Sequence, residues 1–462
     1  MTYLDVVSAP PATAHSHADA PLLPLVSAGV RVPTLGGDDR RYVDLDIAAT
    51  SPALQSVADR VAELLPYAGS VHRGAGLPSR WSTALLAQAR ERIGRIIGTR
   101  ADDLVVFTRN TTDALNLLAA AVPAGAGVVT LDIEHHANLL PWQQRGDHRV
   151  VPYAPTIDKT LVRLATELDQ RPAALVAITG ASNVTGELLP IETVVHIAHS
   201  RGARVVIDGA QLIPHGAIDL AESAVDYVAF SGHKLYAPYG AGVLAGRRDW
   251  LDLAKPYLAG GGAVRNVTTD DTVWADGAER HEAGTPNLIG AVAIAEALDA
   301  LAALPAGTLA EHEQALRVRL EDAIDDIDGV VRHTIWGDAG PRVGTVCFTV
   351  DGVPAGLVAA VLSAEHAIGV RDGRFCAHPL IERFGLGTDG AVRASVGVGT
   401  TRSDIDRLIS AVRCLAAHGP HAAYEQQAGV WGPVDDDRRP PAVLGLDGPI
   451  GHTASPCRDV RG

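Results

Sequence analysis

Lysine is nearly missing from this sequence, which contains three lysines and 36 arginines in 462 residues. Arginine carries a surface charge as well as lysine does, but its guanidinium stays protonated and cannot form an imine with an aldehyde. One of the three lysines, Lys234, lies in the stretch SGHKLYAPYG among small residues. Most lysines are ordinary solvated side chains, but the retention of this one in such a neighbourhood indicates a chemical role.

Other shortages exclude whole classes of protein. No Lys or Arg precedes Arg31 and no apolar run is long enough to span a membrane, so we expect neither a signal peptide nor a membrane anchor and predict a cytoplasmic protein. The four cysteines have no C-x-x-C spacing, which argues against a zinc site or a redox pair, and we predict no metal site. A net charge of −15 without a basic block disfavours a nucleic acid or a membrane surface as partner.

Short β-branched runs alternate with longer amphipathic or Ala-rich segments, which is typical of a mostly parallel sheet covered by helices on both faces. The predicted strands of this sheet span 103–107, 127–131, 174–179, 203–208, 226–231 and 240–246. After about residue 290 the pattern changes and indicates a smaller α+β domain. Its predicted elements are a helix within 288–304, strands at 344–351 and 391–399, and helices at about 355–366 and 403–417.

These patterns divide the chain into four predicted segments. Residues 1–40 are rich in Ala, Pro and His, and we expect a flexible extension, part of it able to pack on the small domain. Residues 41–290 form the large domain and residues 291–418 the small domain. Residues 419–462 are expected to be a poorly ordered tail.

Polar residues gather where the predicted parallel strands end, which is the ligand-binding edge of such sheets. Thr111 and Thr112 follow the first strand at the start of a helix, where hydroxyls and backbone N–H groups suit a phosphate. Asp208 ends a buried strand, a costly place for an unpaired acid. Pyridoxal phosphate needs a lysine for its aldehyde, a helix N-terminus for its phosphate and a carboxylate for its ring nitrogen. Lys234, Thr112 and Asp208 could supply one each, and the sequence therefore predicts this cofactor.

The chain resembles the class V aminotransferase family of fold type I, and within it the SUF-type (group II) cysteine desulfurases and selenocysteine lyases. The resemblance covers about residues 40–417 and implies a large domain with a mostly parallel seven-stranded sheet and a smaller C-terminal α+β domain. It is carried by eight blocks in order: VHRG at 71–74, EHHANLLPWQ at 134–143, SNVTGELLP at 182–190, DGAQ at 208–211, SGHKLYAPYGAGVL at 231–244, RHEAGTPN at 280–287, VRDGRFCAHPL at 370–380 and VRASVGVGTT at 392–401.

The resemblance assigns a role to each site residue. It implies that Lys234 forms the Schiff base, that Asp208 pairs with the pyridine nitrogen and that Gln211 bonds the ring hydroxyl. His135 would stack on the ring and take part in catalysis, with Asn183 beside it. The phosphate would be held by Thr111, Thr112, Ser231 and His233, and also by Thr285 of a second subunit. Three would bind the substrate: His72, Arg371 and Arg393. The resemblance also implies a homodimer with shared sites.

Cys376 distinguishes the possible reactions. The resembling enzymes carry at this position the thiolate that takes sulfur from cysteine, and we expect Arg371 and Arg374 to favour the thiolate form. The family usually has a glycine and two histidines before this cysteine, whereas Gly373 is followed here by Arg374 and Phe375. Small residues, VGVGTT, also replace the aromatic and polar segment expected after RAS. The other cysteines are predicted to lie in the core or the tail: Cys347 and Cys414 in the core, Cys457 in the tail.

Three functions remain open from the sequence. The first is removal of sulfur or selenium from L-cysteine or L-selenocysteine through a persulfide on Cys376, with a sulfur-acceptor protein as a candidate partner. The second is another class V reaction, such as transamination, epimerisation or C–S lysis, which needs Lys234 but not Cys376. The third is a catalytically silent scaffold or sulfur-carrier partner, which the intact set of Lys234, Asp208 and Arg393 disfavours.

Overall fold

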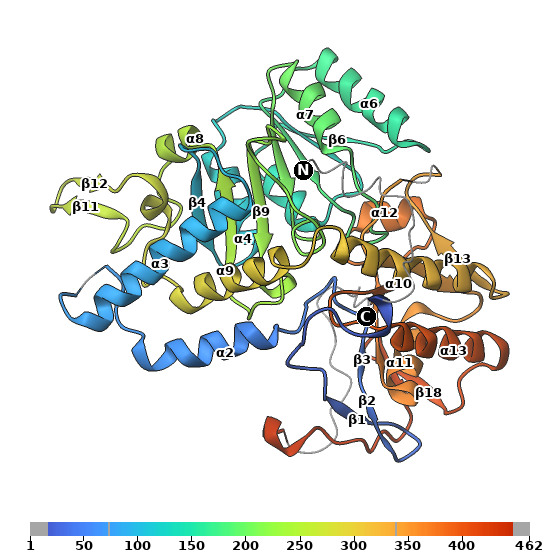
Figure 1. The fold of residues 1–462 in the computed structure, drawn as a ribbon. Coiled ribbons are helices and arrows are strands. Elements are labelled where there is room, and N and C mark those ends of the chain that lie inside the picture. Colours follow the sequence, from blue (N-terminus) through green and yellow to red (C-terminus); the bar gives the residue numbers. More distant parts are fainter. Residues whose placement is uncertain (1–16, 73, 338–339, 447–462) are drawn as a thin grey trace.

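The structure is a computed structural model that describes residues 17–72, 74–337 and 340–446. Its large domain contains a seven-stranded sheet with the strand order β4-β10-β9-β8-β7-β5-β6 (Figure 1). All neighbouring strands are parallel except β10, which is antiparallel to both β4 and β9. This confirms the predicted mostly parallel sheet. The strands are β4 (Leu104–Thr108), β5 (Val128–Leu131), β6 (His148–Val151), β7 (Leu175–Thr179), β8 (Arg204–Asp208), β9 (Tyr227–Ser231) and β10 (Gly242–Gly246).

Different helices cover the two faces of this sheet, because side chains alternate between the faces along each strand. In β7, Val176 and Ile178 pack under one set of helices, whereas Leu175 and Ala177 pack under the other. The first set contains α2 (Gln55–Leu64), α3 (Leu77–Ile96), α6 (Ile157–Gln170), α7 (Ile191–His199) and α9 (Leu288–Ala302). The second contains α4 (Thr111–Ala121), α5 (Leu140–Gln143) and α8 (Arg248–Leu253). Burial on both faces explains why these strands are continuous apolar runs.

The sequence analysis missed strand β6, which lies at the edge of the sheet. It pairs only with β5, and most of its residues are partly exposed. Its sequence, HRVV, begins with two polar residues and therefore lacks the apolar run that marked the central strands.

The small domain contains a four-stranded antiparallel sheet with the order β13-β14-β17-β16. Helices α10, α11 and α13 pack around it, and Leu316, Phe348, Val358 and Ile405 lie in the core between them. The sequence analysis predicted β14, α11, β17 and α13 and missed β13, β16, α10 and α12. The elements are α10 (Thr308–Asp325), β13 (Val330–His333), β14 (Thr345–Val350), α11 (Ala355–His366), β16 (Arg371–Gly373), α12 (His378–Arg383), β17 (Ala391–Ser395) and α13 (Arg402–His418).

The start of the described chain packs on the small domain. Ala18, in a short 3-10 helix, is buried in the small-domain core, and Asp19 forms a 3.0 Å ion pair with Arg402 of α13. Strand β3 (Val43–Asp44) runs parallel to β15 (Ile368–Gly369), although the sequence had placed residue 41 onward in the large domain. The chain therefore enters the large domain only after crossing the small one.

The chain after α13 forms a β-hairpin, so the expectation of a poorly ordered tail from residue 419 is wrong up to at least residue 433. Strands β18 (Tyr424–Gln427) and β19 (Val430–Pro433) are joined by a two-residue turn whose residues, Ala428 and Gly429, both have positive φ angles of 47° and 79°. The hairpin packs along α11. The Tyr424 hydroxyl donates to Glu365 Oε1 at 3.1 Å, and the backbone N–H of Ala422 donates to the same oxygen at 3.2 Å.

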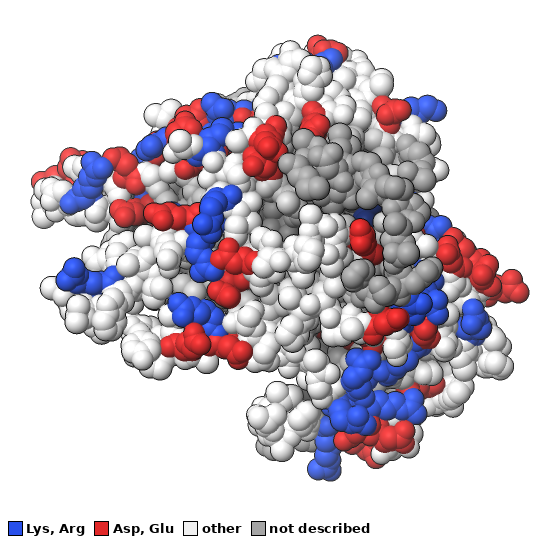
Figure 2. Space-filling view, in the orientation of Figure 1, with Lys and Arg blue, Asp and Glu red and all other residues white. Residues whose placement is uncertain are grey.

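Charged side chains are interspersed on the face seen in Figure 2, where one small group of basic side chains lies over β1 (Arg31–Pro33) and β2 (Asp39–Arg41) with acidic side chains beside it. Arg40 pairs there with Asp38 at 3.2 Å, and Arg41 pairs with Asp404. None of the helices in the described ranges is both long and apolar enough to cross a membrane.

Candidate active site

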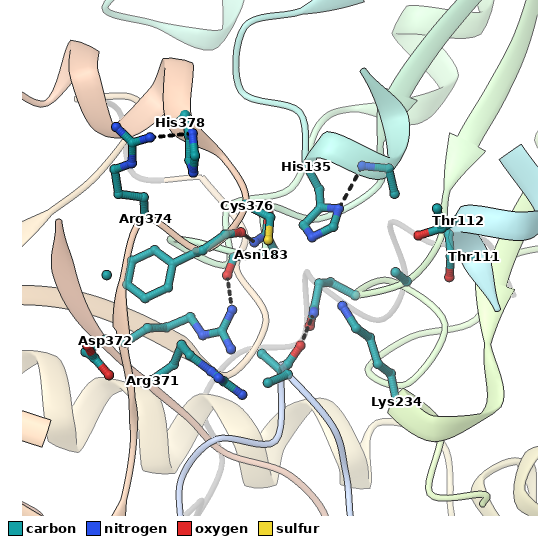
Figure 3. A pocket seen from close by; sticks show the side chains of 18 of the residues that line it. Thr111, Thr112, His135, Asn183, Lys234, Arg371, Asp372, Arg374, Cys376 and His378 are labelled. Carbon is teal, nitrogen blue, oxygen red and sulfur yellow. Dashed lines mark hydrogen bonds between the residues drawn. The ribbon is translucent and has the colours of Figure 1, made fainter. Parts of the chain in front are cut away.

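A single cavity of about 650 Å³ brings together most of the predicted site residues. It lies where the carboxyl ends of the sheet strands of the large domain meet β16, β17 and the loop before α12 of the small domain (Figure 3). Its lining includes these predicted residues: Thr111, Thr112, His135, Asn183, Asp208, Gln211, Ser231, His233, Lys234, Arg371, Cys376 and Arg393.

Lys234 ends the short 3-10 helix that directly follows β9. The preceding Gly232 permits this turn, because a Cβ there would lie 2.9 Å from the Ile294 side chain and 3.2 Å from the Ala241 carbonyl. Burial lowers the pKa of Lys234 to about 8, against the opposing effect of Asp208. The amine therefore has a neutral fraction near neutral pH and can act as a nucleophile or a base.

Asp208 is the last residue of β8 and is almost fully buried. Its Oδ1 accepts a hydrogen bond from the backbone N–H of Ala210 at 3.0 Å. Burial raises the pKa of this carboxyl, while the Ala210 N–H and Lys234 lower it. Gln211 follows Asp208 after a short turn, and its Nε2 donates a hydrogen bond of 2.6 Å to the Ala48 carbonyl, which orients the side chain. Both side chains line the cavity.

His135 projects into the cavity from the loop after β5 (Figure 3). Its Nδ1 accepts a hydrogen bond from the backbone N–H of Ala137 at 3.0 Å, so the ring proton is on Nε2. Burial, and next the positive charge of Lys234, lower the pKa of His135 to about 3. A neutral, flat ring is thus held in the pocket, as stacking on an aromatic ligand requires.

Hydroxyl groups and an imidazole line the cavity at the N-terminus of α4. Ser231 Oγ accepts from the backbone N–H of Thr111 at 2.7 Å and lies 2.6 Å from Thr111 Oγ1. His233 Nδ1 lies 2.6 Å from Thr50 Oγ1, a residue that the sequence analysis did not single out. A helix N-terminus with hydroxyls and an imidazole beside it forms a group suited to a phosphate. With the lysine and the buried Asp208 carboxylate, the donor set fits pyridoxal phosphate.

Cys376 lies on a strained loop between β16 and α12. Phe375 and Cys376 both have φ angles of 52°, in the left-handed region that costs about 1–2 kcal/mol for a residue other than glycine. Asn183 Nδ2 donates to the Phe375 carbonyl at 2.9 Å, and the backbone N–H of His136 donates to the Cys376 carbonyl at 2.7 Å. These two hydrogen bonds from the large domain hold the small-domain loop, so Cys376 lines the same cavity as Lys234.

Arg393 and Arg371 share one carboxylate that the sequence analysis missed. They lie opposite each other on β17 and β16, and Asp46 binds Arg393 Nη2 at 3.0 Å and Arg371 Nη2 at 2.7 Å. Arg393 is buried, and its Nη1 donates to the Asn183 carbonyl at 2.7 Å, while its Nε has no partner among the described residues. Its guanidinium carbon lies 5.4 Å from the Phe375 ring centre, a cation–π distance. The buried guanidinium can therefore bind a carboxylate in the cavity.

The guanidinium of Arg374 lies beside His378, and its expected effect on the Cys376 thiol stays a prediction. One of its Nη atoms lies 2.6 Å from His378 Nδ1, and Figure 3 shows the guanidinium turned toward His378 and away from Cys376. The His378 ring in turn meets the His136 ring edge to face, with 4.3 Å between ring centres. Arg374, His378 and His136 therefore form a polar group beside the Cys376 loop.

Some predicted residues lie elsewhere. His72 and Thr285 are exposed and do not line the cavity of their own chain, and the expected contribution of Thr285 to a second subunit stays a prediction. Cys347 is buried in β14 as predicted, and burial raises its pKa to about 12. Cys414 was expected in the core but is partly exposed on α13, with its sulfur 3.5 Å from His421 Nε2. Cys457 lies outside the described residues.

The C-terminal hairpin contributes three lining residues that the sequence analysis missed: Gln426, Gly429 and Trp431. The sequence does contain a hairpin signal, because in YEQQAGVWGP two short runs with aromatic or β-branched residues flank an Ala-Gly turn. It was overlooked because the resemblance ended near residue 417.

Comparison with known proteins identifies the family. The family model described as aminotransferase class-V matches residues 43–408. The chain belongs to the class V aminotransferase family. It is 36% identical over 381 residues to a probable cysteine desulfurase of Vibrio cholerae, with 80% of this chain and 92% of that protein covered. It is also 36% identical over 411 residues to probable cysteine desulfurase 2 of Mycobacterium leprae, covering 86% and 94%.

Solved structures of class V enzymes share the fold. The cysteine desulfurase CsdA of Escherichia coli matches with a TM-score of 0.72 at 32% identity, covering 80% of this chain and 94% of that one. The apo cysteine desulfurase of Thermococcus onnurineus matches with a TM-score of 0.74 at 31% identity, covering 81% and 95%. These likenesses confirm the fold type I class and the resemblance read from the sequence blocks. The family match ends at residue 408, before the C-terminal hairpin begins.

Proposed function

We propose that the protein is a pyridoxal-phosphate-dependent cysteine desulfurase, which removes sulfur or selenium from L-cysteine or L-selenocysteine and releases alanine. The observation that carries the proposal is the placement of Cys376 in one cavity with Lys234, Asp208 and Arg393. The names of the relatives support the same chemistry.

In this proposal each lining residue has one task. Thr111, Ser231 and His233 hold the cofactor phosphate, and Asp208 pairs with its ring nitrogen. When bound, the cofactor draws electrons away from the α-carbon of the substrate. Arg393 binds the substrate carboxylate, and the neutral Nζ of Lys234 removes the α-proton.

Cys376 then accepts the sulfur. Its thiolate attacks the sulfur of the substrate, so that a new S–S bond forms while the substrate Cβ–S bond breaks. The electron pair of the broken bond stays on the carbon fragment, which is protonated to alanine, and the persulfide remains on Cys376. The hydrogen bonds from Asn183 and His136 to the Cys376 loop support this step, because they hold the backbone that carries the thiol.

Three further elements belong to the proposal. The active unit is a homodimer in which Thr285 reaches the phosphate site of its partner. A sulfur-acceptor protein takes the sulfur from Cys376, and the enzyme acts in the cytoplasm. The exposure of Thr285 next to Gly284, which has a φ of 95°, is compatible with such a contact.

The departure from the family pattern supports one alternative. Arg374 and Phe375 stand where two histidines are usual, and Arg374 turns toward His378. A class V aminotransferase, epimerase or C–S lyase reaction would use Lys234 and Arg393 in the same way and leave Cys376 idle.

The test is incubation of the cofactor-loaded enzyme with L-cysteine. We expect alanine and sulfide in the presence of a reducing thiol. Without that thiol, mass spectrometry should find one added sulfur on the Cys376 peptide and none on the Cys347 or Cys414 peptides. An unmodified Cys376 peptide, together with turnover of another amino acid, would favour the alternative.

A further inference from the structure

Two arginines of the small domain line the cavity side by side. Arg371 of β16 and Arg393 of β17 are direct partners across the antiparallel strands, so their side chains lie on the same face of the sheet. Like charges in such opposed positions repel each other. The neighbouring Asp372 is turned the other way in Figure 3, as the alternation of side chains along a strand requires. The counter-ion of the arginine pair therefore comes from another segment.

Asp46 is this counter-ion, and it divides its carboxylate unequally between the two arginines. It binds Arg371 through two nitrogens, with Nη2 2.7 Å from Oδ2 and Nε 3.4 Å from Oδ1. It contacts Arg393 through one nitrogen, Nη2, which lies 3.0 Å from Oδ1. Arg393 Nη1 donates to the Asn183 carbonyl, and its Nε has no partner among the described residues. The fork of Arg371 is thus engaged by Asp46, whereas Arg393 retains donors for a ligand.

The backbone around Asp46 is fixed by the small domain. The Leu45 carbonyl accepts from the backbone N–H of Ser395 at 2.7 Å, and the backbone N–H of Ala48 donates to Ser395 Oγ at 2.9 Å. The backbone N–H of Asp46 donates to Asp44 Oδ1 at 3.0 Å. Asp44, the other acid of this segment, thus binds the backbone, and Asp46 is held in one position beside the arginines.

Asp46 is not among the residues that line the cavity, so it acts on a ligand only through the two guanidinium groups. A ligand with one carboxylate can bind Arg393 and leave the pair of Asp46 and Arg371 intact. A second carboxylate would have to displace Asp46 from Arg371, and the displaced acid, whose side chain is only 22% exposed, would lose a charged partner. Such a cost imposed on a competing ligand is one of the two ways in which a site gains specificity.

Building on the proposed function, we propose that Asp46 is a positioning residue that determines substrate specificity. By engaging Arg371, it leaves Arg393 as the guanidinium that binds a substrate carboxylate. The site therefore selects amino acids that carry a single carboxylate, a class that includes L-cysteine and L-selenocysteine. Amino acids with a second carboxylate in the side chain are disfavoured.

Two amino acids of nearly the same size and shape test this selection. L-Aspartate and L-asparagine differ in the charge of the side chain, and neither contains sulfur. The cofactor-loaded enzyme is titrated with each, and the change in cofactor absorbance gives the dissociation constant. We expect the wild type to bind L-asparagine about tenfold more tightly than L-aspartate. Equal affinities, or tighter binding of L-aspartate, would overturn the proposal without any variant.

Asp46→Asn removes the charge that engages Arg371 and should remove the selection. We expect the affinity for L-aspartate to rise about tenfold relative to the affinity for L-asparagine. A merely structural role of Asp46 would lower both affinities together and leave their ratio unchanged, which would overturn the proposal. Asp44→Asn keeps an acceptor for the backbone N–H of Asp46 and is the matched control, which should retain the wild-type ratio.

A double variant tests whether Arg371 is the group that Asp46 withholds. In Asp46→Asn combined with Arg371→Gln, the gain in affinity for L-aspartate should disappear, because the second guanidinium is gone. Cofactor absorbance at the start of each titration shows that the site is assembled in every variant. If the double variant keeps the gain, another cation binds the second carboxylate and the proposal fails.

These titrations separate the inference from the proposed function, because they report carboxylate binding and involve no sulfur. If the ratio of affinities shifts as expected but L-cysteine yields no alanine, desulfuration fails and Asp46 selects the substrate of another class V reaction. If L-cysteine yields alanine but the ratio is the same in Asp46→Asn and wild type, only the role of Asp46 fails.

Discussion

The two ends of the active-site cavity are formed by different kinds of structural element. At the cofactor end, Asp208 is buried and ends a strand of the large domain, whereas Lys234 and His135 are partly buried and lie a few residues after strand ends of the same sheet. At the outer end, Cys376, Trp431 and Asp389 are partly or largely exposed, and they lie on a left-handed loop, a hairpin and a connecting loop of the small domain. The cofactor end is set by one sheet, whereas the outer end is assembled from separate segments.

This difference separates the shared chemistry from the specific chemistry. The cofactor end satisfies the needs of pyridoxal phosphate, which every reaction of the class V family has in common. The outer end decides whether a thiol takes part and what approaches it. Two departures from the family pattern, Arg374 and Phe375, lie in the loop that carries Cys376. A change at the cofactor end should therefore stop all chemistry, and a change at the outer end should alter the reaction or the partner.

The largest effect is expected from Lys234→Ala, which should lower turnover by about 10⁴-fold because the nucleophile and base is lost. Borohydride reduction of the wild type should attach the cofactor to the Lys234 peptide, and the variant should give no adduct. Lys159→Ala, at an exposed position of α6, is the control and should keep full activity. An adduct on Lys159 or Lys255 would contradict the assignment of the cofactor end.

Cys376→Ser should lower alanine release from L-cysteine by about 10²–10³-fold while the cofactor absorbance stays unchanged, because only the outer end loses a nucleophile. L-Selenocysteine should remain a partial substrate, since selenium leaves more readily than sulfur. Cys414→Ser, half-buried on α13 and outside the cavity lining, is the matched control. Full activity of Cys376→Ser on L-cysteine would show that the two ends do not divide the chemistry in this way.

The buried lysine should make the cofactor-free protein less stable below pH 8. Its pKa falls from 10.5 in the unfolded chain to about 8 in the folded one, so the charged form costs the folded state about 3 kcal/mol at pH 7. The cost declines as the pH rises from 8 to 10.5 and disappears above 10.5, where the amine is neutral in both states. Lys234→Met should thus be more stable than wild type at pH 7 and equal to it at high pH.

Urea unfolding of the cofactor-free proteins at pH 7 and at high pH measures this difference. Lys159→Met, at an exposed position, should show no such dependence. A stability difference between Lys234→Met and wild type that is the same at both pH values would contradict the lowered pKa.

The smallest effect is expected from Asn183→Ala, which removes the side-chain hydrogen bond from the large domain to the Phe375 carbonyl. One hydrogen bond is worth about 1 kcal/mol, so persulfide formation on Cys376 should slow by about fivefold to tenfold. Cofactor reduction by borohydride should still label Lys234. Single-turnover alanine release with L-cysteine measures the effect, and equal losses of cofactor affinity and turnover would place Asn183 at the cofactor end instead.

Most of the cofactor end could be predicted because its signals are local in the sequence. A polar residue that directly follows a buried strand of a parallel sheet reaches the same edge as the other strand ends, whatever the rest of the chain does. Thr111 and Asp208 were found in this way, and Lys234 was found from the scarcity of lysine. Asp46 was not, because its partners Arg371 and Arg393 are more than three hundred positions away and nothing near Asp46 marks it.

The outer end could be predicted only in part. Cys376 was recognised from the family blocks, and the expected effect of Arg374 on the thiol stays a prediction, although the sequence did not show that its guanidinium lies beside His378. The hairpin was taken for a tail, since Gly, Pro and charged residues follow it and its few apolar side chains are too sparse to form a core alone. Its stability comes from Glu365 and α11, which the local sequence does not reveal.

The sequence by itself determined the fold class and predicted the cofactor and the lysine that would bind it, since strand runs and the polar residues at strand ends are local features of the sequence. The tertiary structure decided which groups share the cavity: the arginine pair on Asp46, the left-handed Cys376 loop held by Asn183 and His136, and the hairpin wall with Trp431. The physical reason is that these arrangements depend on contacts between segments far apart in the chain, whose favourable geometry exists only once both domains are packed.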